Sequence, residues 1–275
     1  MMFSAKNFTF TLGEKTYIMG ILNVTADSFF DGGLYNSPEK ALVHAKEMLN
    51  DGAHIIDIGA QSTRPGCVQL SANEELEIIK NYLPMLYNET NAVISVDTFY
   101  PEVAEYALQN GASIINDVSG IFNEEMATLI RDYNCGWVIM HTGGGDAQTV
   151  PEYKNSVTED VVSFFNETLE KCDEFGISKN QIMLDMGIGF GKTYEQNIEL
   201  IKNINKLKIN DVALLTALSS KRVVANATNT DGYDRVYGTI AADVLAIAGG
   251  TDFIRVHNVK ENALAAKMAD VIIRG

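Results

Sequence analysis

The feature that most constrains the fold of this chain is a recurring cycle of short apolar runs, each followed by a helical pattern. Each run is nearly continuous in apolar residues, which is typical of strands buried on both faces. Strands that alternate with helices pair in parallel and connect by right-handed crossovers. We expect strands at residues 18–22, 54–59, 92–96, 113–115, 137–140, 182–184, 212–216 and 253–254.

The segments between these runs carry the start and stop signals of helices. Ser37 precedes Pro38, as an N-cap precedes the first helical residue, and Gly52 follows the last apolar position of that segment. Eight such βα units in 275 residues predict a (β/α)8 TIM barrel, with a doubly wound open sheet as the alternative. Further helices are predicted at residues 73–87, 101–110, 123–131, 158–175, 195–204, 234–248 and 260–273.

A short patterned segment precedes the first of these strands. Residues 8–12 and 15–17 flank Gly13 and Glu14, and we interpret them as a β-hairpin that leads into the barrel. The hydrophobic fraction is 46%, so a chain of this length buries a full core without disulfides. No linker, low-complexity segment or shift in composition divides the sequence, and we predict a single domain over residues 1–275.

Charge and cysteine content limit the class of protein. A net charge of −15 and a pI near 4.6 argue against binding of nucleic acid or of an anionic membrane surface. No apolar run approaches the ~20 residues of a membrane span, and the N-terminal residues lack the apolar segment of a signal peptide. Cys67, Cys135 and Cys172 are widely spaced, which favours a reducing compartment over a zinc site. We therefore expect a cytoplasmic enzyme.

A polar residue stands at or just beyond the end of every predicted strand. In a barrel the carboxyl ends of all strands meet on one face, where the active sites of this architecture lie. A single strand-end aspartate is more often a capping or turn residue. A cap, however, does not require a carboxylate, an amide or a cation at every strand. We expect convergence of Asn23, Asp57, Asp97, Asn116, His141, Asp185, Lys221, Arg255 and His257.

These residues divide into two chemical groups. Asp97, Asn116 and Asp185 offer carboxylate and amide oxygens, which suit a flat heterocycle that presents adjacent N–H donors. A second group is cationic or can become so, and suits an anion such as phosphate. The sequence therefore predicts a heterocycle deep in the site and an anionic group nearer the mouth. The second group consists of Arg64, Lys221, Arg255 and His257.

The glycine-rich stretch at residues 187–193 matches neither of two known motifs. It is not a P-loop, because Met186 stands where the first glycine would be, and Lys192 replaces the third glycine of a dinucleotide fingerprint. We expect this stretch to let a ligand approach the backbone closely, with Phe190 lining the site. The glycines at 143–145 are interpreted as a turn.

Taken together, the strand-end motifs resemble those of the dihydropteroate synthase family. They occur in the family's order, one at each strand end, over nearly the whole chain. The joint match is specific, whereas the GFGK stretch alone would not be. The matching stretches are residues 19–33 (MGILNVTADSFFDGG), 57–66 (DIGAQSTRPG), 96–98 (VDT), 115–120 (INDVSG), 140–141 (MH), 185–192 (DMGIGFGK), 219–222 (SSKR) and 255–257 (RVH).

The resemblance implies a homodimeric barrel with small-molecule substrates. Such an enzyme condenses 6-hydroxymethyl-7,8-dihydropterin pyrophosphate with p-aminobenzoate in folate biosynthesis. The products are 7,8-dihydropteroate and pyrophosphate, and sulfonamides bind at the p-aminobenzoate slot. By motif, the pterin would be held by Asp97, Asn116, Met140, Asp185, Phe190 and Lys221.

The same resemblance assigns the remaining roles. Pyrophosphate would be bound by Asn23, Arg64, Arg255 and His257, with Mg²⁺ at Asn23. The p-aminobenzoate slot would be formed by Thr63, Pro65, Phe190, Ser220 and Arg222. The catalytic residues would be Asp27, on a first loop that closes over the site, together with Lys221, Arg255 and His257.

Four positions depart from the usual family pattern. Ala26, Gln61 and Met186 stand where the family has Pro, Glu and Pro, and Ser220 stands where it has Arg. The serine removes a cation near the p-aminobenzoate side, for which Arg222 is a candidate replacement. Two alternative functions would also use carboxylates deep in the barrel to bind a pterin. One is a methyltetrahydrofolate:corrinoid methyltransferase, which needs no pyrophosphate site, and the other is a pterin-binding paralogue that does not condense its ligand.

Overall fold

The computed structural model describes residues 1–24, 37–61, 69–145 and 149–275. Within them a closed barrel of parallel strands runs in the order β10-β3-β4-β5-β6-β7-β8-β9, which confirms the predicted (β/α)8 architecture. β10 closes the barrel by pairing Arg255 with Met19 of β3. The barrel strands are β3 (Tyr17–Asn23), β4 (Ile55–Gly59), β5 (Val93–Asp97), β6 (Ile114–Asp117), β7 (Gly136–Met140), β8 (Ile182–Asp185), β9 (Ala213–Thr216) and β10 (Phe253–Val256).

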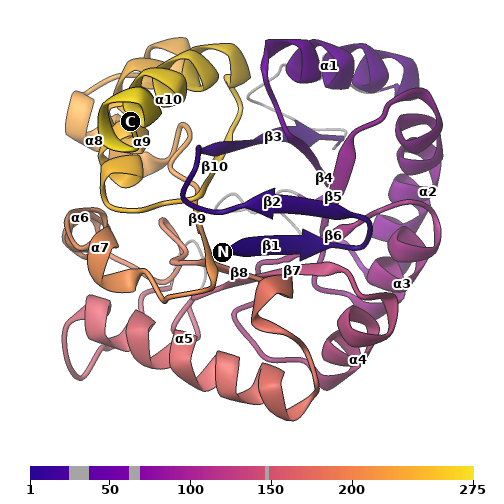
Figure 1. The fold of residues 1–275 in the computed structure, drawn as a ribbon, viewed down its shortest axis with the longest axis horizontal. Helices are drawn as coiled ribbons and strands as arrows, with labels where there is room; N and C mark the ends of the chain where they lie inside the picture. The colour runs from indigo at the N-terminus through magenta and orange to yellow at the C-terminus, as the bar shows by residue number, and fades with distance from the viewer. Residues whose placement is uncertain (25–36, 62–68, 146–148) are drawn as a thin grey trace.

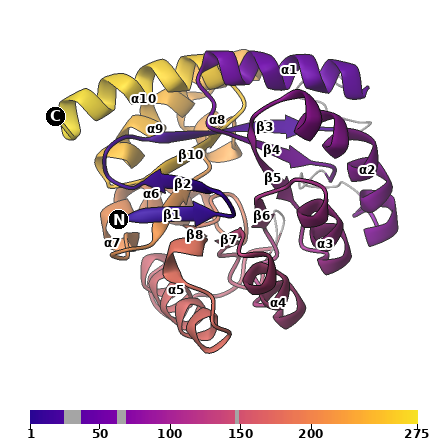
Figure 2. The same cartoon turned by 45° about the vertical axis from the view of Figure 1, so that its right-hand side comes forward.

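Helices surround the barrel, as Figures 1 and 2 show from two directions. One short helix, α8, follows Lys221 and was not expected from the sequence. Among the described residues, no helix is long and apolar enough to cross a membrane. The helices are α1 (Pro38–Asp51), α2 (Ala72–Glu89), α3 (Pro101–Gln109), α4 (Glu124–Tyr133), α5 (Val157–Glu174), η1 (Lys179–Gln181), α6 (Tyr194–Lys202), α7 (Ile204–Leu207), α8 (Arg222–Thr228), η2 (Gly232–Asp234), α9 (Arg235–Ala248) and α10 (Val259–Ile273).

The local signals at the start and end of α1 act as predicted. The Ser37 hydroxyl accepts a hydrogen bond from the backbone N–H of Lys40, and Pro38 is the first helical residue. Gly52 ends the helix with a φ of 111°, a left-handed conformation that glycine adopts without steric cost. The first βα unit is therefore delimited by local chemistry alone.

The N-terminal hairpin is present, but its predicted strand pair was wrong. β1 (Met2–Ala5) pairs with β2 (Phe8–Thr11), whereas Tyr17 already belongs to β3. The reason is the aromatic cluster that the hairpin brings to the barrel end: Phe3 and Phe10 each lie 5.5 Å from the ring of Phe253. In Figure 1 the two strands cross the open end of the barrel and cover it.

Two apolar clusters hold the molecule together. The larger lies between the strands and the helices, and the smaller fills the barrel interior beneath the hairpin. Because the smaller cluster seals the N-terminal end, the opposite end of the barrel is left for polar side chains. The interior cluster contains Phe3, Ala5, Phe10, Leu12, Tyr17, Met19, Ile55, Val93, Ile114, Val138, Met183, Ala213, Leu215 and Phe253.

Candidate active site

The barrel interior changes from apolar to polar within two residues along most of the strands. Side chains alternate between the interior and the surrounding helices, so the residue two positions after an interior residue also faces inward. Ile55 of β4 lies in the interior cluster, and Asp57 therefore does too; the same step leads from Phe253 to Arg255. On the strands other than β9, this inward layer consists of Ile21, Asp57, Ser95, Asn116, Met140, Asp185 and Arg255.

Arg255 lies at the centre of this polar layer. Its Nε donates to Oδ2 of Asp57 at 2.6 Å, and its Nη2 donates to Oδ2 of Asp97 at 2.8 Å. The amide of Asn116 donates to the same Asp57 oxygen at 3.1 Å. Four predicted strand-end residues thus meet in one network, in which the buried cation is compensated by two carboxylates.

Asp57 is a site residue to which the sequence analysis assigned no role. It is 0% exposed and holds both Arg255 and Asn116. A signal was present in the sequence, because Asp57 interrupts an otherwise apolar run. It stands two positions after Ile55, so its side chain points to the same side of the strand, into the barrel. A carboxylate inside a barrel strand requires a partner, but its partner lies 198 residues away in the chain.

Several carboxyl groups lie close to this network. Burial raises the pKa of Asp97 to about 7, against the opposing charge of Arg255, and the carboxyl groups of Asp57 and Glu75 raise it further. Burial likewise raises the pKa of Glu75, on α2, to about 7 and that of Asp117 to about 6. The acidic side of the site therefore takes up or releases protons near neutral pH.

Asp185 ends β8 and anchors the glycine-rich loop. Its Oδ1 accepts the backbone N–H of Gly187 at 2.8 Å, which leaves its second oxygen for a ligand. Lys192 holds the loop in place, because its ammonium donates to the carbonyls of His141, Gly187 and Phe190 at 3.0, 3.0 and 2.8 Å. Lys192 is therefore a structural cation and not a phosphate ligand.

Lys221 lies with Phe190 at the mouth of the barrel, against the glycine-rich loop that Asp185 anchors. The Lys221 ammonium lies 5.1 Å from the centroid of the Phe190 ring and donates to the carbonyl of Ile188 at 2.5 Å. Burial lowers the pKa of Lys221 to about 8, although the carboxylate of Asp185 opposes this shift. The loop and the lysine thus form one wall, as expected for two residues assigned to the same ligand.

The turn after β9 joins the end of β10 through Ser219. Its hydroxyl lies 3.0 Å from Nδ1 of His257 and accepts the backbone N–H of His257 at 3.1 Å. Ser220 has a φ of 56°, and its backbone N–H donates to Oγ1 of Thr239. The Ser220 hydroxyl is buried without a hydrogen-bond partner among the described residues, whereas Arg222 is exposed in the first turn of α8.

Asn23 lies at the end of β3, beside the acidic network. A Cβ atom on Gly59 would lie 3.5 Å from the Asn23 side-chain oxygen and 3.7 Å from Cβ of Asp97, so both side chains crowd the same glycine. Within residues 1–24, 37–61, 69–145 and 149–275, no group of three or more His, Cys, Asp or Glu side chains is arranged to hold a metal ion. Protein carboxylates alone therefore do not form a metal site in this part of the chain.

The predicted position of His141 in the site was wrong. The sequence analysis placed it with the converging strand ends, but its Nε2 lies 2.8 Å from Oδ1 of Asp160 on α5. The cause is alternation: Met140 takes the inward position of β7, and His141 follows with the opposite direction. Four other predicted site residues lie outside the described residues, namely Asp27, Thr63, Arg64 and Pro65.

The part of the chain that matches a known protein family contains the residues of the candidate site. Positions 19–257 match the family model described as "Pterin binding enzyme", a span that begins in β3 and ends just after β10. The chain belongs to the pterin-binding enzyme family. That span contains every predicted site residue, including those in the two loops outside the described residues.

Relatives within this family share one activity by name. The dihydropteroate synthase of Clostridium beijerinckii is 40% identical over 267 residues, which cover 96% of this chain and 97% of that protein. The dihydropteroate synthase of Bacillus subtilis is 41% identical over 262 residues, which cover 94% of this chain and 90% of that protein. The family and the dihydropteroate synthase function expected from the sequence are thereby confirmed, and with them the class of pterinylmethyl transferase.

Solved structures of pterin-binding enzymes agree in fold. The Clostridium difficile dihydropteroate synthase, crystallised in the presence of pteroic acid, has a TM-score of 0.90 and 42% identity and covers 97% of this chain and 100% of its own. The Yersinia pestis enzyme with a sulfonamide drug complex has a TM-score of 0.92 and 34% identity, covering 99% of both chains. The Xanthomonas albilineans enzyme with 4-aminobenzoic acid has a TM-score of 0.90 and 33% identity, covering 98% of this chain and 97% of that one.

Proposed function

We propose that the inward polar layer of this barrel binds 6-hydroxymethyl-7,8-dihydropterin pyrophosphate and condenses it with p-aminobenzoate. One observation supports this assignment above the others. Hydrogen-bond acceptors and cations share one barrel end, with Asp185 on one side and the pair of Arg255 and Asp57 at the centre. A methyltransferase would need the acceptors but not the cations, so the combination favours the condensing enzyme.

The pterin ring is assigned to the acceptor side. Asp185 has one oxygen engaged by the backbone N–H of Gly187, so its other oxygen accepts from the pterin's amide edge. Asn116 is oriented by Asp57, and Met140 faces the same interior. Phe190, with Lys221 above its ring, covers the far side of the pterin and borders the p-aminobenzoate slot.

The pyrophosphate is assigned to Arg255, His257 and Asn23. Arg255 contacts Asp57 and Asp97 through Nε and Nη2, and we assign its remaining nitrogen, Nη1, to a phosphate oxygen. His257 is oriented by Ser219, whose hydroxyl lies 3.0 Å from Nδ1. We assign this imidazole to the anion because a histidine ring can donate a hydrogen bond to a phosphate oxygen. Arg64, from the loop outside the described residues, completes the proposed set.

The proposed reaction exchanges one bond at the pterin methylene carbon for another. The bond between the pterin methylene carbon and the pyrophosphate oxygen breaks, and Arg255 and His257 stabilise the negative charge that develops on the leaving group. The electron-rich dihydropterin stabilises the methylene cation, and we assign Asp27 as a further negative charge on the closing first loop. The arylamine nitrogen attacks the methylene carbon and loses a proton, in a site closed to water.

Mg²⁺ fits this arrangement as a substrate-bound ion. The Asn23 amide oxygen, at the end of β3 beside Asp97, is a hard oxygen ligand of the kind that Mg²⁺ takes. Mg²⁺ in phosphate sites is commonly held by one or two protein oxygens together with substrate phosphates and waters, which accords with the sparse protein ligands here. When bound, the ion would neutralise pyrophosphate charge as a Lewis acid.

We infer that two copies of this chain associate through α9 and α10. These helices pack on one another and leave an apolar outer face: Leu264 is 60% exposed, Met268 61% and Val271 68%. An apolar face on adjacent helices is typical of a subunit interface. We further propose a cytoplasmic, single-domain protein, in keeping with the buried free thiols of Cys135 and Cys172.

A turnover assay tests the proposed function. The purified chain is incubated with the pterin pyrophosphate, p-aminobenzoate and Mg²⁺, and dihydropteroate formation is followed together with pyrophosphate release. We expect equal amounts of both products and no turnover without p-aminobenzoate. Tight pterin binding without any product would instead identify a non-condensing paralogue.

A further inference from the structure

The glycine-rich loop after β8 contains a tight turn at residues 187–190. The backbone N–H of Phe190 donates to the carbonyl of Gly187 at 3.1 Å, and Gly189, at the third position of the turn, has a φ of +86°. A positive φ at the third position is the mark of a type II turn and favours glycine there. The central peptide of this turn joins Ile188 to Gly189.

This central peptide is hydrogen-bonded on both sides. The backbone N–H of Gly189 donates to Oδ1 of Asn197 at 2.7 Å, and the carbonyl of Ile188 accepts from Nζ of Lys221 at 2.5 Å. The C=O and N–H groups of a trans peptide point in opposite directions, so Asn197 and Lys221 lie on opposite sides of one planar group. A buried amide on α6 is thereby connected to the lysine that we assign to the pterin.

The orientation of the Asn197 amide is determined by its other partners. The side chain is 4% exposed, and its Nδ2 donates to the carbonyl of Thr193 at 2.6 Å and to that of Lys192 at 3.3 Å. Because these partners are acceptors and the Gly189 N–H is a donor, only one orientation of the amide satisfies all three. Asn197 therefore presents a fixed acceptor to the turn.

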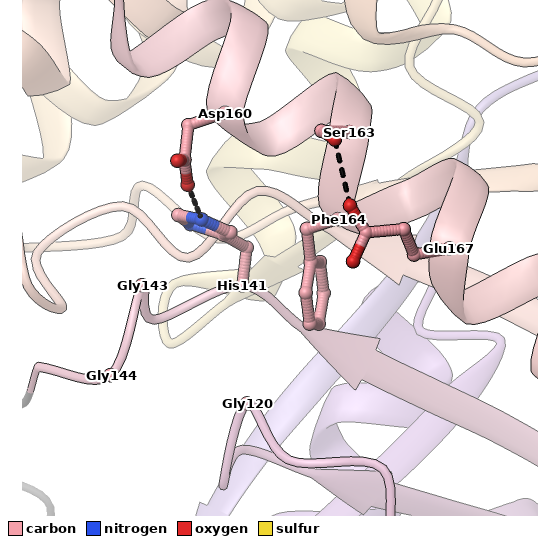
Figure 3. A pocket seen from close by; sticks show the side chains of 8 residues that line it. All are labelled: Gly120, His141, Gly143, Gly144, Asp160, Ser163, Phe164 and Glu167. Carbon is pink, nitrogen blue, oxygen red and sulfur yellow. Dashed lines mark hydrogen bonds and ion pairs between the residues drawn. The ribbon is translucent and has the colours of Figure 1, made fainter. Parts of the chain in front are cut away.

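The two ends of the turn are held by separate contacts. The ammonium of Lys192 donates to the carbonyls of Gly187 and Phe190 at 3.0 and 2.8 Å, and to that of His141 at 3.0 Å. The ring of His141 is in turn bonded to Asp160 of α5, as Figure 3 shows. The direction of the central peptide is thus left to its own two hydrogen bonds.

Rotation of this peptide would change the surroundings of Lys221. Type I and type II turns differ mainly in the direction of the central peptide, and glycine at the third position is compatible with both. In a type I turn the carbonyl of Ile188 would point away from the Lys221 ammonium. The lysine stem lies against the same turn, since a Cβ on Gly189 would be 3.5 Å from Cδ of Lys221.

We propose that Asn197 is a positioning residue for the condensation, which acts by fixing the direction of the 188–189 peptide and thereby the place of the Lys221 ammonium. The inference rests on the proposed role of Lys221 in pterin binding and adds to it a side chain behind the loop. Phe190 follows the same peptide, and its ring centroid lies 5.1 Å from the ammonium. Asn197 therefore positions both groups of this wall.

The protonation of Lys221 reports on this contact. Burial lowers the pKa of Lys221 to about 8; the carboxylates of Asp185 and Asp97 oppose this shift, and the charge of Arg255 adds to it. An ammonium that loses a carbonyl acceptor is less stabilised, so its pKa falls further. Carbon-13 NMR of lysine side chains labelled at Cε follows the titration, and the spectrum of Lys221→Arg assigns the signal.

Two variants at Asn197 separate its hydrogen bonds. Asn197→Ser is too short to reach Gly189, but its hydroxyl can donate to the carbonyl of Thr193, four residues earlier in the helix. We expect the pKa of Lys221 to fall by about 0.5–1 pH unit. Calorimetry should show affinity for 6-hydroxymethyl-7,8-dihydropterin reduced about two- to tenfold.

Asn197→Asp is the complementary variant. It keeps an acceptor for the Gly189 N–H but places an oxygen against the carbonyls of Lys192 and Thr193. Its negative charge can only raise the pKa of a nearby ammonium. The pKa of Lys221 should therefore not fall in this variant, although the start of α6 is weakened.

Thr193→Ala is the matched control. The Thr193 hydroxyl accepts the backbone N–H of Gln196 at 3.2 Å, so its removal weakens the same end of α6 without changing the turn. The pKa of Lys221 should equal that of wild type. An unchanged pKa in Asn197→Ser, a lower one in Asn197→Asp, or an equal fall in Thr193→Ala would each overturn the proposal. The titration uses no substrate, so its result is distinct from that of the turnover assay.

Discussion

At the residue scale, the site depends on charges that compensate one another inside the barrel. Arg255 lies between Asp57 and Asp97, and its guanidinium compensates the negative charge of these carboxylates. The same network fixes the amide of Asn116 through Asp57. The side chains that we propose to bind the ligand are thereby oriented in the free protein, which lowers the cost of binding.

Asp185→Asn should nearly abolish pterin binding while the fold survives. The amide can still accept the Gly187 N–H through its oxygen, but its NH2 group then faces the pterin's N–H donors. We expect a loss of about tenfold to hundredfold in affinity, measured by calorimetry with a pterin ligand. The exposed Asp173→Asn is the matched control, and unchanged affinity in Asp185→Asn would remove Asp185 from the site.

Arg255→Ala should weaken pyrophosphate binding more than binding of the pterin alone. It should also lower the free energy of unfolding by about 3 kcal/mol or less, because Asp57 and Asp97 lose their cation, although Asp97, whose pKa burial raises to about 7, can take up a proton. Calorimetry with each ligand and urea unfolding measure the two effects. An equal loss of affinity for both ligands would indicate a purely structural role.

At the scale of elements, two βα loops are interlocked at the barrel mouth. A Cβ on Gly187 would lie 1.9 Å from the carbonyl oxygen of His141, and one on Gly191 would lie 2.1 Å from that of Thr142. Lys192 ties the same two segments by hydrogen bonds. The loop after β7 and the loop after β8 therefore behave as one rigid wall on which Phe190 is mounted.

Gly187→Ala should be much more destabilising than Gly144→Ala. Both residues have positive φ values, +67° and +82°, so both alanines suffer a left-handed backbone cost of about 1–2 kcal/mol. Only Gly187 meets another backbone, because nothing lies within 4 Å of a Cβ on Gly144. Urea unfolding of the two variants measures the difference, and equal losses would show that the loops are not interlocked.

Asp243→Asn should stabilise the protein, and more so at higher pH. Asp243 lies on the buried face of α9, 2% exposed, and neither oxygen has a hydrogen-bond partner among the described residues. Burial raises the pKa of this carboxyl well above its usual value. A raised folded-state pKa means that stability is full below the unfolded pKa and is lost as pH rises toward the folded pKa.

The advantage of Asp243→Asn over wild type should therefore grow above pH 4, by up to about 1.4 kcal/mol per pH unit, until the folded pKa is reached. Thermal or urea unfolding at pH 4.5, 6 and 7.5 measures this trend, with Asp173→Asn as the exposed control. A stability difference that does not change with pH would show that Asp243 is not protonated in the folded protein.

At the scale of the whole molecule, the barrel separates stability from chemistry. The hairpin of β1 and β2 crosses one end of the barrel (Figures 1 and 2), where its aromatic rings join the interior cluster. The charged network of Arg255, Asp57 and Asp97 lies at the other end, at the carboxyl ends of the strands. Outside the barrel, the apolar side chains of α9 and α10 remain uncovered in a single chain. That surface is the proposed contact with a second copy.

Met268→Glu should therefore convert the proposed dimer into a monomer. The side chain is 61% exposed in one chain, so a glutamate costs little there, but two glutamates buried at a symmetric contact would lose their hydration. Light scattering coupled to size exclusion measures the mass. Val43→Glu, an exposed position on α1, is the control, and a wild-type chain of monomeric mass would refute the interface.

The sequence by itself determined the barrel, the limits of most of its βα units and the presence of acceptors and cations at the strand ends. Continuous apolar runs, local caps such as Ser37 and Asn123, and acceptors and cations at strand ends are all readable within a few residues. These features follow from local conformational propensity and from the periodicity of apolar residues, which act between residues close together in the sequence.

Only the tertiary structure decided which of those residues meet. The pairing of Arg255 with Asp57 depends on closure of the barrel by β10 and β3, and the outward direction of His141 depends on the phase of β7. The hairpin partner of β2 was likewise decided by which aromatic rings could cover the barrel end. Contacts between residues far apart in the chain are selected by packing and closure, because no local signal distinguishes one distant partner from another.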